Sequence, residues 1–301
     1  PLLSAGADVD RSTQIDPTQR TARSDGRSPA NIAVTTFSDE LALYHVDKAK
    51  VFGVSVKDRG AIAMAGHAGK AFWFSKQAGE FVTSQFYYDA YPEWVTAFNS
   101  TAPAQRYADQ DWNLLHPIET YRFADHDDQP WETDFPGYGR TFPHPFGSGD
   151  SKVFTTLLTI SPAGDELVKD FAQELILQED IGLDFVTDYL SVSFSSTGYV
   201  GHLFGPSSLE AEDNLRQLDR TIADLLAFVD KNVGLEHTLI VLSADHGGPD
   251  APEFMHEYGI EAALVDPNSW DKSPAFSRLK THFGIGEKLV QAYFHPYVYL
   301  N

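Results

Sequence analysis

The chain has 301 residues, of which 43 are acidic and 22 are basic, so its formal charge is −21, and it contains no cysteine. This charge argues against nucleic acid and anionic lipid as partners, because both require a basic surface. The lack of cysteine excludes disulfides, thiolate metal sites and cysteine nucleophiles. No apolar run reaches the roughly 18 residues needed to span a membrane.

The N-terminal third is predicted to alternate helices and strands after a polar surface segment over residues 1–28. Apolar spacing predicts a helix from Ala30 to Leu43. The next elements expected in chain order are a buried strand at 50–56, a small-residue helix at 61–67, and strands at 71–75 and 81–88 around a turn at 76–80.

Residues 89–152 lack periodicity and are rich in proline, aromatic residues and aspartate. Trp94, Trp112 and Trp131 fall within this stretch, and such large side chains need a place to be buried. We therefore interpret 89–152 as a long irregular insertion that lies over the core.

The second half shows clearer signals. Ser161 followed by Pro162 predicts the start of a helix that ends near Glu179. A strand at 188–195, a loop at 196–208, a helix at 209–233 with a capping box of Ser207 and Glu210, and a buried strand at 238–243 are expected next. This order, with apolar strands, predicts an α/β fold whose largely parallel sheet is flanked by helices.

Polar residues gather where three predicted strands end, which is where α/β proteins place their sites. The first group contains Lys57 and Arg59, the second contains His202, and the third contains Asp245 and His246. Lys57 and Arg59 could clamp a phosphate, or they could pair with surplus carboxylates. Asp245, His246 and His202 offer zinc ligands, or else a helix cap and ordinary loop histidines.

Several motifs taken together resemble the alkaline phosphatase superfamily, in particular its bacterial PafA-type branch, which is grouped with type I phosphodiesterases and nucleotide pyrophosphatases. The resemblance runs from about residue 28 to the end of the chain. It rests on the segments 54–59, 65–67 with 72–74, 137–144 (GYGRTFPH), 193–197, 199–206 (YVGHLFGP) and 243–247 (SADHG).

The resemblance implies an alkaline-phosphatase-like fold and a two-zinc hydrolase of phosphate monoesters that forms a covalent phospho-Thr or phospho-Ser. Lys57 and Arg59 match the pair that contacts the transferring phosphoryl group and are the expected catalytic and substrate-binding residues. Asp245 and His246 match a ligand pair of one metal, and His202 matches one ligand of the other. The chain is expected to be a single core over 1–301, with an insertion at about 89–152 and the start of another at about 251–301.

The chain also departs from the family pattern. The nucleophile, an Asp ligand and an Asn are expected before Pro1, and a further metal-binding His after Asn301. Gly198 stands where the family has an Asp four residues before His202. We therefore expect weak zinc occupancy in this chain alone, and a sheet that is completed by the missing segments or by another chain.

Three readings of function remain open at this point. The first is a phosphate monoester hydrolase, and the second is a phosphodiesterase or nucleotide pyrophosphatase. The third is an inactive member or fragment that binds phosphate or metal, which the glycine at 198 would favour. Resemblance to exported enzymes implies a periplasmic or secreted location.

Overall fold

The computed structural model describes residues 27–46, 48–264, 266–294 and 297–301. It divides into two compact units, Pro1–Pro249 and Asp250–Asn301. Nearly all of the predicted polar segment at 1–28 lies outside the described residues. The predicted division into one core with two insertions stays a prediction.

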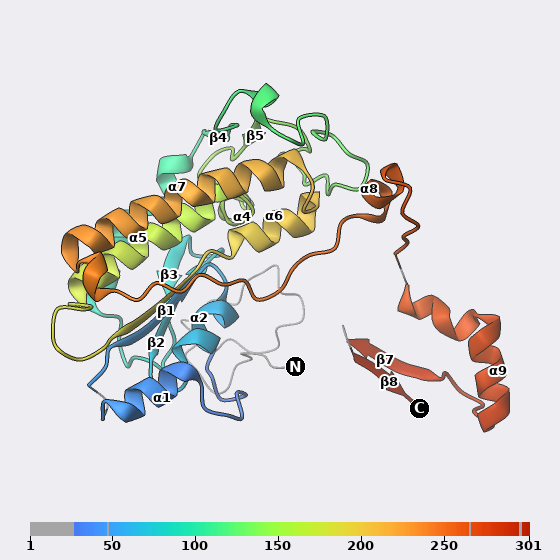
Figure 1. The fold of residues 1–301 in the computed structure, drawn as a ribbon, viewed down its shortest axis with the longest axis horizontal. Coiled ribbons are helices and arrows are strands. Elements are labelled where there is room, and N and C mark those ends of the chain that lie inside the picture. Colours follow the sequence, from blue (N-terminus) through green and yellow to red (C-terminus); the bar gives the residue numbers. More distant parts are fainter. Residues whose placement is uncertain (1–26, 47, 265, 295–296) are drawn as a thin grey trace. The chain divides into compact units, whose positions relative to one another are not determined.

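The larger unit contains a four-stranded sheet with the strand order β3-β2-β1-β6 (Figure 1). β1 is parallel to β2 on one side and to β6 on the other, while β3 is antiparallel to β2. The predicted largely parallel sheet is thereby confirmed. The strands are β1 Val51–Ser55, β2 Lys70–Ser75, β3 Glu80–Val82 and β6 Tyr189–Ser193.

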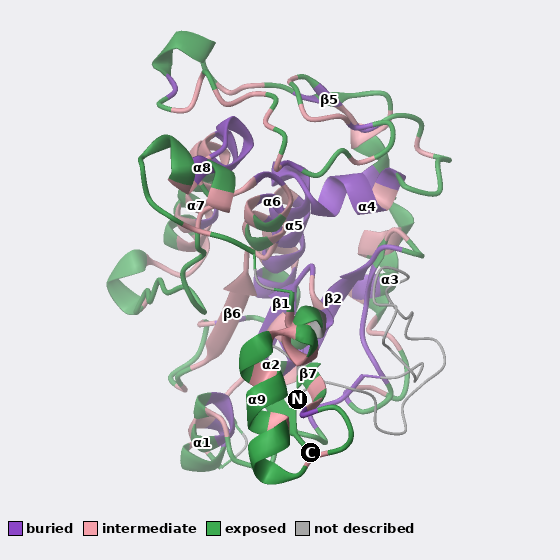
Figure 2. Ribbon diagram, turned by 90° about the vertical axis from the view of Figure 1, so that its right-hand side faces the viewer, coloured by how far each residue is buried: buried purple, intermediate pink, exposed green. Residues whose placement is uncertain are grey.

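Helices cover both faces of this sheet. In Figure 1 α1 and α2 lie on one side and α5 and α7 on the other. All five residues of β1 are buried, whereas all five of β6 are only half-buried (Figure 2). The helices of this unit are α1 Phe37–Tyr44, α2 Asp58–Ala65, α3 Glu93–Ser100, α4 Phe154–Thr159, α5 Pro162–Gln178, α6 Ser196–Phe204 and α7 Leu209–Asn232.

Gly53 in the middle of β1 lets α2 pack directly against the sheet. A Cβ atom at this position would lie 2.3 Å from the carbonyl oxygen of Ala61 in α2, which is closer than real atoms approach. Glycine therefore allows the strand and helix backbones to come together. This contact fixes α2, whose first residue lies between Lys57 and Arg59.

The core between the sheet and α5 is strongly aromatic, with Phe171 of α5 at its centre. The ring of Phe171 stacks on Phe81 at 4.2 Å between centroids and also contacts Phe72. It meets Trp94 and Phe98 of α3 as well. One residue of α5 thus joins two strands and the first helix of the insertion in a single cluster.

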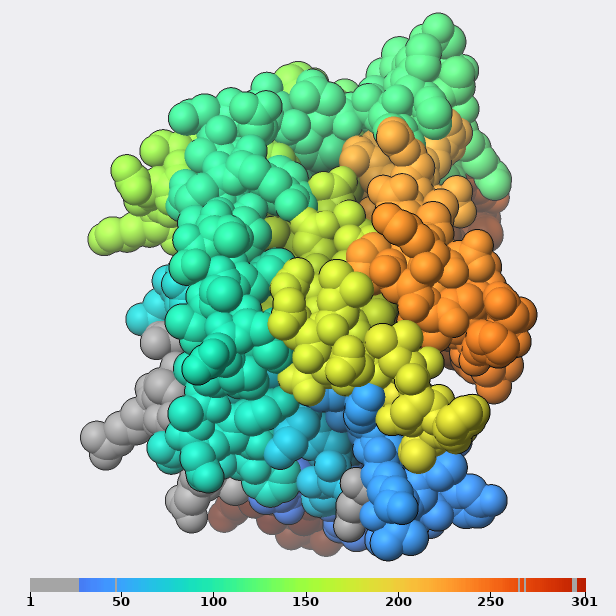
Figure 3. All heavy atoms as spheres, turned by 90° about the vertical axis from the view of Figure 1, so that its left-hand side faces the viewer, coloured from blue at the N-terminus to red at the C-terminus, as the bar shows by residue number. Residues whose placement is uncertain are grey.

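The predicted insertion is mostly irregular and is held on the core by specific hydrogen bonds. Buried Asp213 of α7 accepts hydrogen bonds from Trp112 Nε1 at 2.7 Å and from the Tyr121 hydroxyl at 2.6 Å. On the face drawn in Figure 3, residues of this segment form a continuous teal and green layer. Besides α3, its short elements are η1 Pro103–Tyr107, β4 Asp111–Trp112, η2 Ile118–Thr120 and β5 His144–Pro145.

The smaller unit contains short helices and a two-stranded antiparallel hairpin. Its strands β7 and β8 are separated by residues 295–296, which lie outside the described residues. Its elements are α8 Pro252–Glu257, η4 Pro267–Lys272, α9 Pro274–Phe283, β7 Val290–Phe294 and β8 Tyr297–Leu300.

The prediction of a loop at 196–208 was wrong, because residues 196–204 form α6. Gly198 and Gly201 lie in this segment, and glycine disfavours helices. Buried Asp165 of α5 overrides this tendency by accepting a hydrogen bond from the backbone N–H of Ser196 at 3.0 Å. That bond satisfies one of the free amides at the start of the helix.

The prediction of a buried strand at 238–243 was also wrong. The segment follows η3 Leu235–His237 and pairs with no described strand. Leu239 is 90% exposed and Leu242 is 82% exposed. Its sequence has the apolar character of a strand, but it forms no ladder with β6, which is the edge strand of the described sheet. β6 is therefore an edge strand and only half-buried, and the segment 238–243 is exposed.

Three smaller expectations are corrected. The helix expected from Ala30 begins at Phe37, because Thr36 and Asp39 form a capping box there. The strand expected at 81–88 is short and ends at Val82. The long helix is capped by Ser208, whose side chain accepts from Ala211 N–H, and not by Ser207.

Candidate functional site

Lys57 and Arg59 lie where β1 passes into α2. Asp58 between them is buried and forms an ion pair with buried Arg27. The backbone N–H of Lys57 donates to Ser55 Oγ at 3.0 Å, which fixes the turn at the strand end. Lys57 is half-buried and Arg59 is about half exposed, so both cations remain near the surface at the carboxyl end of the sheet.

The surroundings of Lys57 weaken its hold on a proton. Burial, followed by the charge of Arg59, lowers the pKa of Lys57 to about 8, while the carboxylate of Asp245 acts in the opposite direction. Its ammonium nitrogen lies 4.1 Å from the centroid of the Tyr199 ring. A doubly negative group beside Lys57 would raise this pKa again, because opposite charges favour ionisation.

Gly198, one residue before Tyr199, lies directly beside Lys57. A Cβ atom at 198 would have a single near neighbour, the Lys57 ammonium at 3.4 Å. This is ordinary van der Waals contact, so the site has room for a side chain there. The first turn of α6 therefore faces Lys57 with a residue that contributes no ligand atom.

The start of α6 is held by residues that the sequence did not suggest. Asp165 accepts hydrogen bonds from Ser196 N–H and, at 3.2 Å, from the Thr197 hydroxyl. Asn214 of α7 donates to the Thr197 hydroxyl at 2.9 Å. Burial raises the pKa of Asp165 to about 7. Asp165 is an acidic residue in the first turn of the predicted helix at 162–179, and this position was the sequence signal that could have indicated its role in holding α6.

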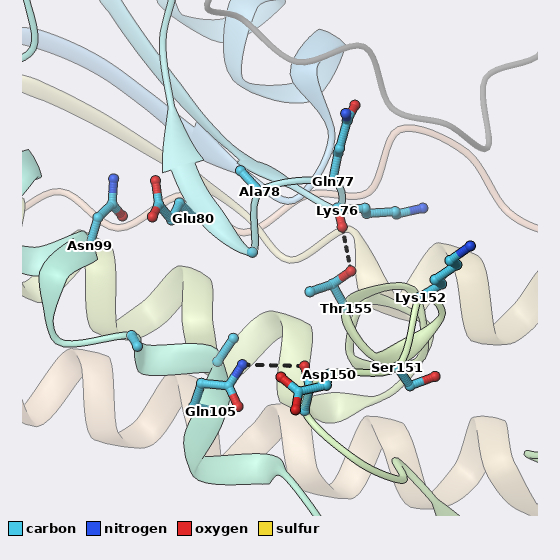
Figure 4. Close-up of a pocket in the computed structure, with 14 residues that line it drawn as sticks. Lys76, Gln77, Ala78, Glu80, Asn99, Gln105, Asp150, Ser151, Lys152 and Thr155 are labelled. Carbon is cyan, nitrogen blue, oxygen red and sulfur yellow. Dashed lines mark hydrogen bonds between the residues drawn. The ribbon is translucent and has the colours of Figure 1, made fainter.

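Lys76 is a further residue that the sequence did not indicate. It follows β2 directly, is only 5% exposed, and its ammonium lies 4.4 Å from the centroid of the same Tyr199 ring. Its carbonyl oxygen accepts a hydrogen bond from the Thr155 hydroxyl, drawn as a dashed line in Figure 4. Lys76 also borders a hollow of about 600 Å³, although neither Lys57 nor Arg59 does.

The residues expected to bind zinc do not form a complete centre. His202 in α6 is exposed. Asp245 and His246 are 88% and 66% exposed and lie within 3.3 Å of each other. Among the described residues, no three histidine, aspartate or glutamate side chains lie close enough together to hold a metal ion. These residues alone do not fit a zinc centre.

A separate polar cluster is buried beneath the insertion. His144 Nε2 lies 3.3 Å from the Glu210 carboxylate, and both side chains are fully buried. Burial lowers the pKa of His144 to about 4 and raises the pKa values of Glu210 and Glu132 to about 8. The cluster stands among the aromatic rings of Tyr138, Phe142 and Phe204 and bears on stability.

Residues 28–294 match the family of type I phosphodiesterases and nucleotide pyrophosphatases. Alkaline phosphatase PhoV of Synechococcus elongatus is 41% identical over 230 residues, covering 76% of this chain and 42% of PhoV. Alkaline phosphatase PafA of Elizabethkingia meningoseptica is 37% identical over 292 residues, covering 95% of this chain and 53% of PafA.

Solved structures agree with these similarities. The crystal structure of wild-type PafA superposes with a TM-score of 0.81 at 36% identity, covering 91% of this chain and 52% of that one. A second structure is of a PafA variant in which a lysine and an arginine two positions apart are both alanine; Lys57 and Arg59 have the same spacing. The chain thus spans about half the length of these relatives. No helix among the described residues is long and apolar enough to cross a membrane.

Proposed function

The chain belongs to the type I phosphodiesterase and nucleotide pyrophosphatase family, and on that basis we propose that it forms part of a phosphate monoester hydrolase. The observation that carries this proposal is the pairing of Lys57 with Arg59 at the carboxyl end of β1, beside the first turn of α6. Two cations in this position favour a phosphoryl group that carries two negative charges over a diester that carries one.

In the proposed reaction, the bond between phosphorus and the ester oxygen breaks, and water supplies an oxygen to the phosphate and a proton to the released alcohol. Lys57 and Arg59 would bind the non-bridging oxygens and stabilise the charge that develops on them in the transition state. Following the family resemblance, we assign the attacking Thr or Ser hydroxyl to a part of the protein outside residues 1–301.

The family pattern also implies zinc. His202, Asp245 and His246 are the residues of this chain that we propose as ligands, and zinc would supply charge stabilisation when bound. Since they form no three-ligand group here, the centre would need further ligands from outside the described residues. We also propose, from the resemblance, that the protein is exported to the periplasm or beyond.

The experiment compares p-nitrophenyl phosphate with bis-p-nitrophenyl phosphate as substrates of the full protein in the presence of zinc. We expect the monoester to have the larger kcat/KM, and Lys57→Met or Arg59→Met to lower it at least tenfold. Lys231→Met, at an exposed position near the end of α7, is the matched control and should leave it unchanged. Faster cleavage of the diester would overturn the monoester assignment.

Gly198 favours a second candidate, an inactive member that binds phosphate without turnover. The position faces Lys57 with no ligand atom, although a side chain would fit. Turnover by the unaltered protein would exclude this candidate. Turnover that appears only in Gly198→Asp would establish it.

A further inference from the structure

Lys76 and Lys57 are brought together by the register of two neighbouring strands. β1 and β2 are parallel, and Ser55 of β1 lies opposite Trp73 of β2. Lys57 comes two residues after Ser55 and Lys76 three residues after Trp73, so both lysines leave the sheet at the same edge. The carboxyl edge of a parallel sheet is where ligand-binding residues collect.

Both ammonium groups lie against the ring of Tyr199. The distances from the ring centroid are 4.1 Å for Lys57 and 4.4 Å for Lys76, so the two nitrogens are at most 8.5 Å apart. A cation near an aromatic ring is stabilised by the negative charge of the ring face. Two cations on one ring still repel each other, and a nearby anion relieves this repulsion.

The backbone around Lys76 is firmly held, so its position does not depend on the ring contact alone. Gly79 N–H donates to the Ser75 carbonyl oxygen at 2.7 Å, and Ala78 N–H donates to Ser75 Oγ at 3.1 Å. The Thr155 hydroxyl holds the Lys76 carbonyl from the start of α4. A buried lysine on such a fixed turn is unusual, because lysine is almost never fully buried unless its charge is compensated.

We propose that Lys76 is a positioning residue of the anion site: its charge, next to that of Lys57 on the Tyr199 ring, holds Lys57 toward the phosphate and raises the affinity of the site for doubly negative phosphate. Lys76 does not need to touch the substrate. Burial and the charge of Arg59 are the main causes of the lowered Lys57 pKa, and the charge of Lys76 adds to them, in agreement with this coupling. The inference rests on the proposed function only in taking phosphate as the anion.

The test is calorimetric titration of inorganic phosphate into the full protein in zinc-containing buffer. We expect Lys76→Met, which keeps the length of the side chain and removes its charge, to weaken phosphate binding about tenfold. Lys76→Arg should restore most of the affinity. Replacing Tyr199 by Leu should reproduce the loss, whereas Tyr199→Phe, which keeps the ring, should retain most of the affinity.

Lys70 provides a matched control at the other end of β2. Its ammonium lies 4.8 Å from the ring centroid of Tyr88 and donates to the Tyr87 carbonyl oxygen at 2.5 Å. It is therefore also a lysine on a tyrosine ring, but at the opposite edge of the sheet. Lys70→Met should leave the affinity for phosphate unchanged. An equal loss in Lys70→Met and Lys76→Met would mean a general loss of structure and would overturn the assignment.

The outcomes separate this inference from the proposed function. If the protein binds phosphate through Lys76 but hydrolyses no monoester, the proposed activity fails and the role of Lys76 stands. If the protein hydrolyses monoesters and Lys76→Met binds phosphate normally, the role of Lys76 fails and the activity stands. Absence of phosphate binding by the unaltered protein also overturns the role of Lys76.

Discussion

Asp165 at the start of α5 accepts a hydrogen bond from the backbone amide of Ser196 at the start of α6, at 3.0 Å. The carboxylate is fully buried and also binds the Thr197 hydroxyl. Gly198 and Tyr199 follow at once in the chain. The conformation of the helix turn that faces Lys57 therefore depends on one carboxyl group from a different helix.

Removing this carboxyl group should loosen the start of α6. We expect Asp165→Ala to lower the free energy of unfolding by about 1–3 kcal/mol, the usual cost of leaving buried hydrogen-bond donors without an acceptor. Asp165→Asn keeps an acceptor oxygen and should cost less. Denaturant unfolding monitored by circular dichroism measures both, and equal losses in the two variants would contradict the assigned role.

The same residue predicts a dependence of stability on pH. Because the pKa of Asp165 is raised to about 7 in the folded protein, the folded state holds this proton more tightly than the unfolded state. The contribution is fully present below the ordinary aspartate pKa near 4 and is lost as the pH rises through about 7. In Asp165→Asn, the fall in unfolding free energy between pH 4 and pH 7 should be smaller than in the unaltered protein.

Gly198→Asp should place a carboxylate against Lys57. Since a Cβ at this position lies in ordinary contact with the Lys57 ammonium, we expect an ion pair that raises the pKa of Lys57 above about 8. The pH dependence of Lys57 modification by an amine-reactive reagent, read by mass spectrometry, measures this change. Gly198→Asn is the matched uncharged control, and an equal shift in the two variants would refute the ion pair.

The buried carboxyl of Glu210 should make the protein less stable at higher pH. Its pKa is raised to about 8 by burial, so its contribution is present below the ordinary glutamate pKa and is lost as the pH rises through about 8. Glu210→Gln should remove much of that decline, by on the order of 4 kcal/mol at pH 8. Thermal unfolding from pH 5 to pH 9 measures it.

Glu212, on the same helix, provides the opposite control. Burial acts to raise its pKa, but hydrogen bonds from Phe123 and Arg122 N–H and from Arg216 outweigh burial and lower it. Its contribution to stability is present above the ordinary glutamate pKa and is lost as the pH falls. Glu212→Gln should therefore leave the decline toward pH 8 in place. Loss of that decline in Glu212→Gln would show that it does not arise at Glu210.

The exposed apolar segment at 238–243 should make residues 1–301 associate when they are produced alone. Leu239 is 90% exposed and Val241 is 79% exposed, and unpaired apolar strand-like segments promote aggregation. We expect Leu239→Asp with Val241→Asp to reduce light scattering without loss of helical signal. Val54→Asp, at a fully buried position of β1, should prevent folding. A monomeric, cooperatively unfolding chain would contradict the expectation.

The sequence predicted those elements whose local signals agree with their tertiary surroundings. Ser161 and Pro162 marked the start of α5 correctly, and the apolar run of β1 indicated a strand buried on both faces. The signals misled where distant residues decide the outcome. The glycine-containing segment 196–208 was predicted as a loop, but Asp165 from another helix stabilises α6 there, and 238–243 has strand character but pairs with no described strand.

The residues of the candidate site divide in the same way, into those with a local sequence signal and those placed by distant residues. Lys57 and Arg59 were found because they directly follow a recognisable strand. Lys76 follows a strand equally closely but was assigned to a turn, since only the register of β1 with β2 brings it to Tyr199. The buried pair of His144 and Glu210 joins residues far apart in the chain, and no spacing in the sequence indicates such a contact.

The packing of Phe171 also bears on the order in which parts of the protein open. The helix is about 25 Å long, with Asp165 beside α6 at one end and the Phe171 ring cluster reaching α3, β2 and β3 farther along. A fluctuation that frees this helix would expose both regions at once. The backbone amides of α5, α6 and β2 should then exchange with deuterium as one cooperative group, more slowly than those of α1 at the periphery.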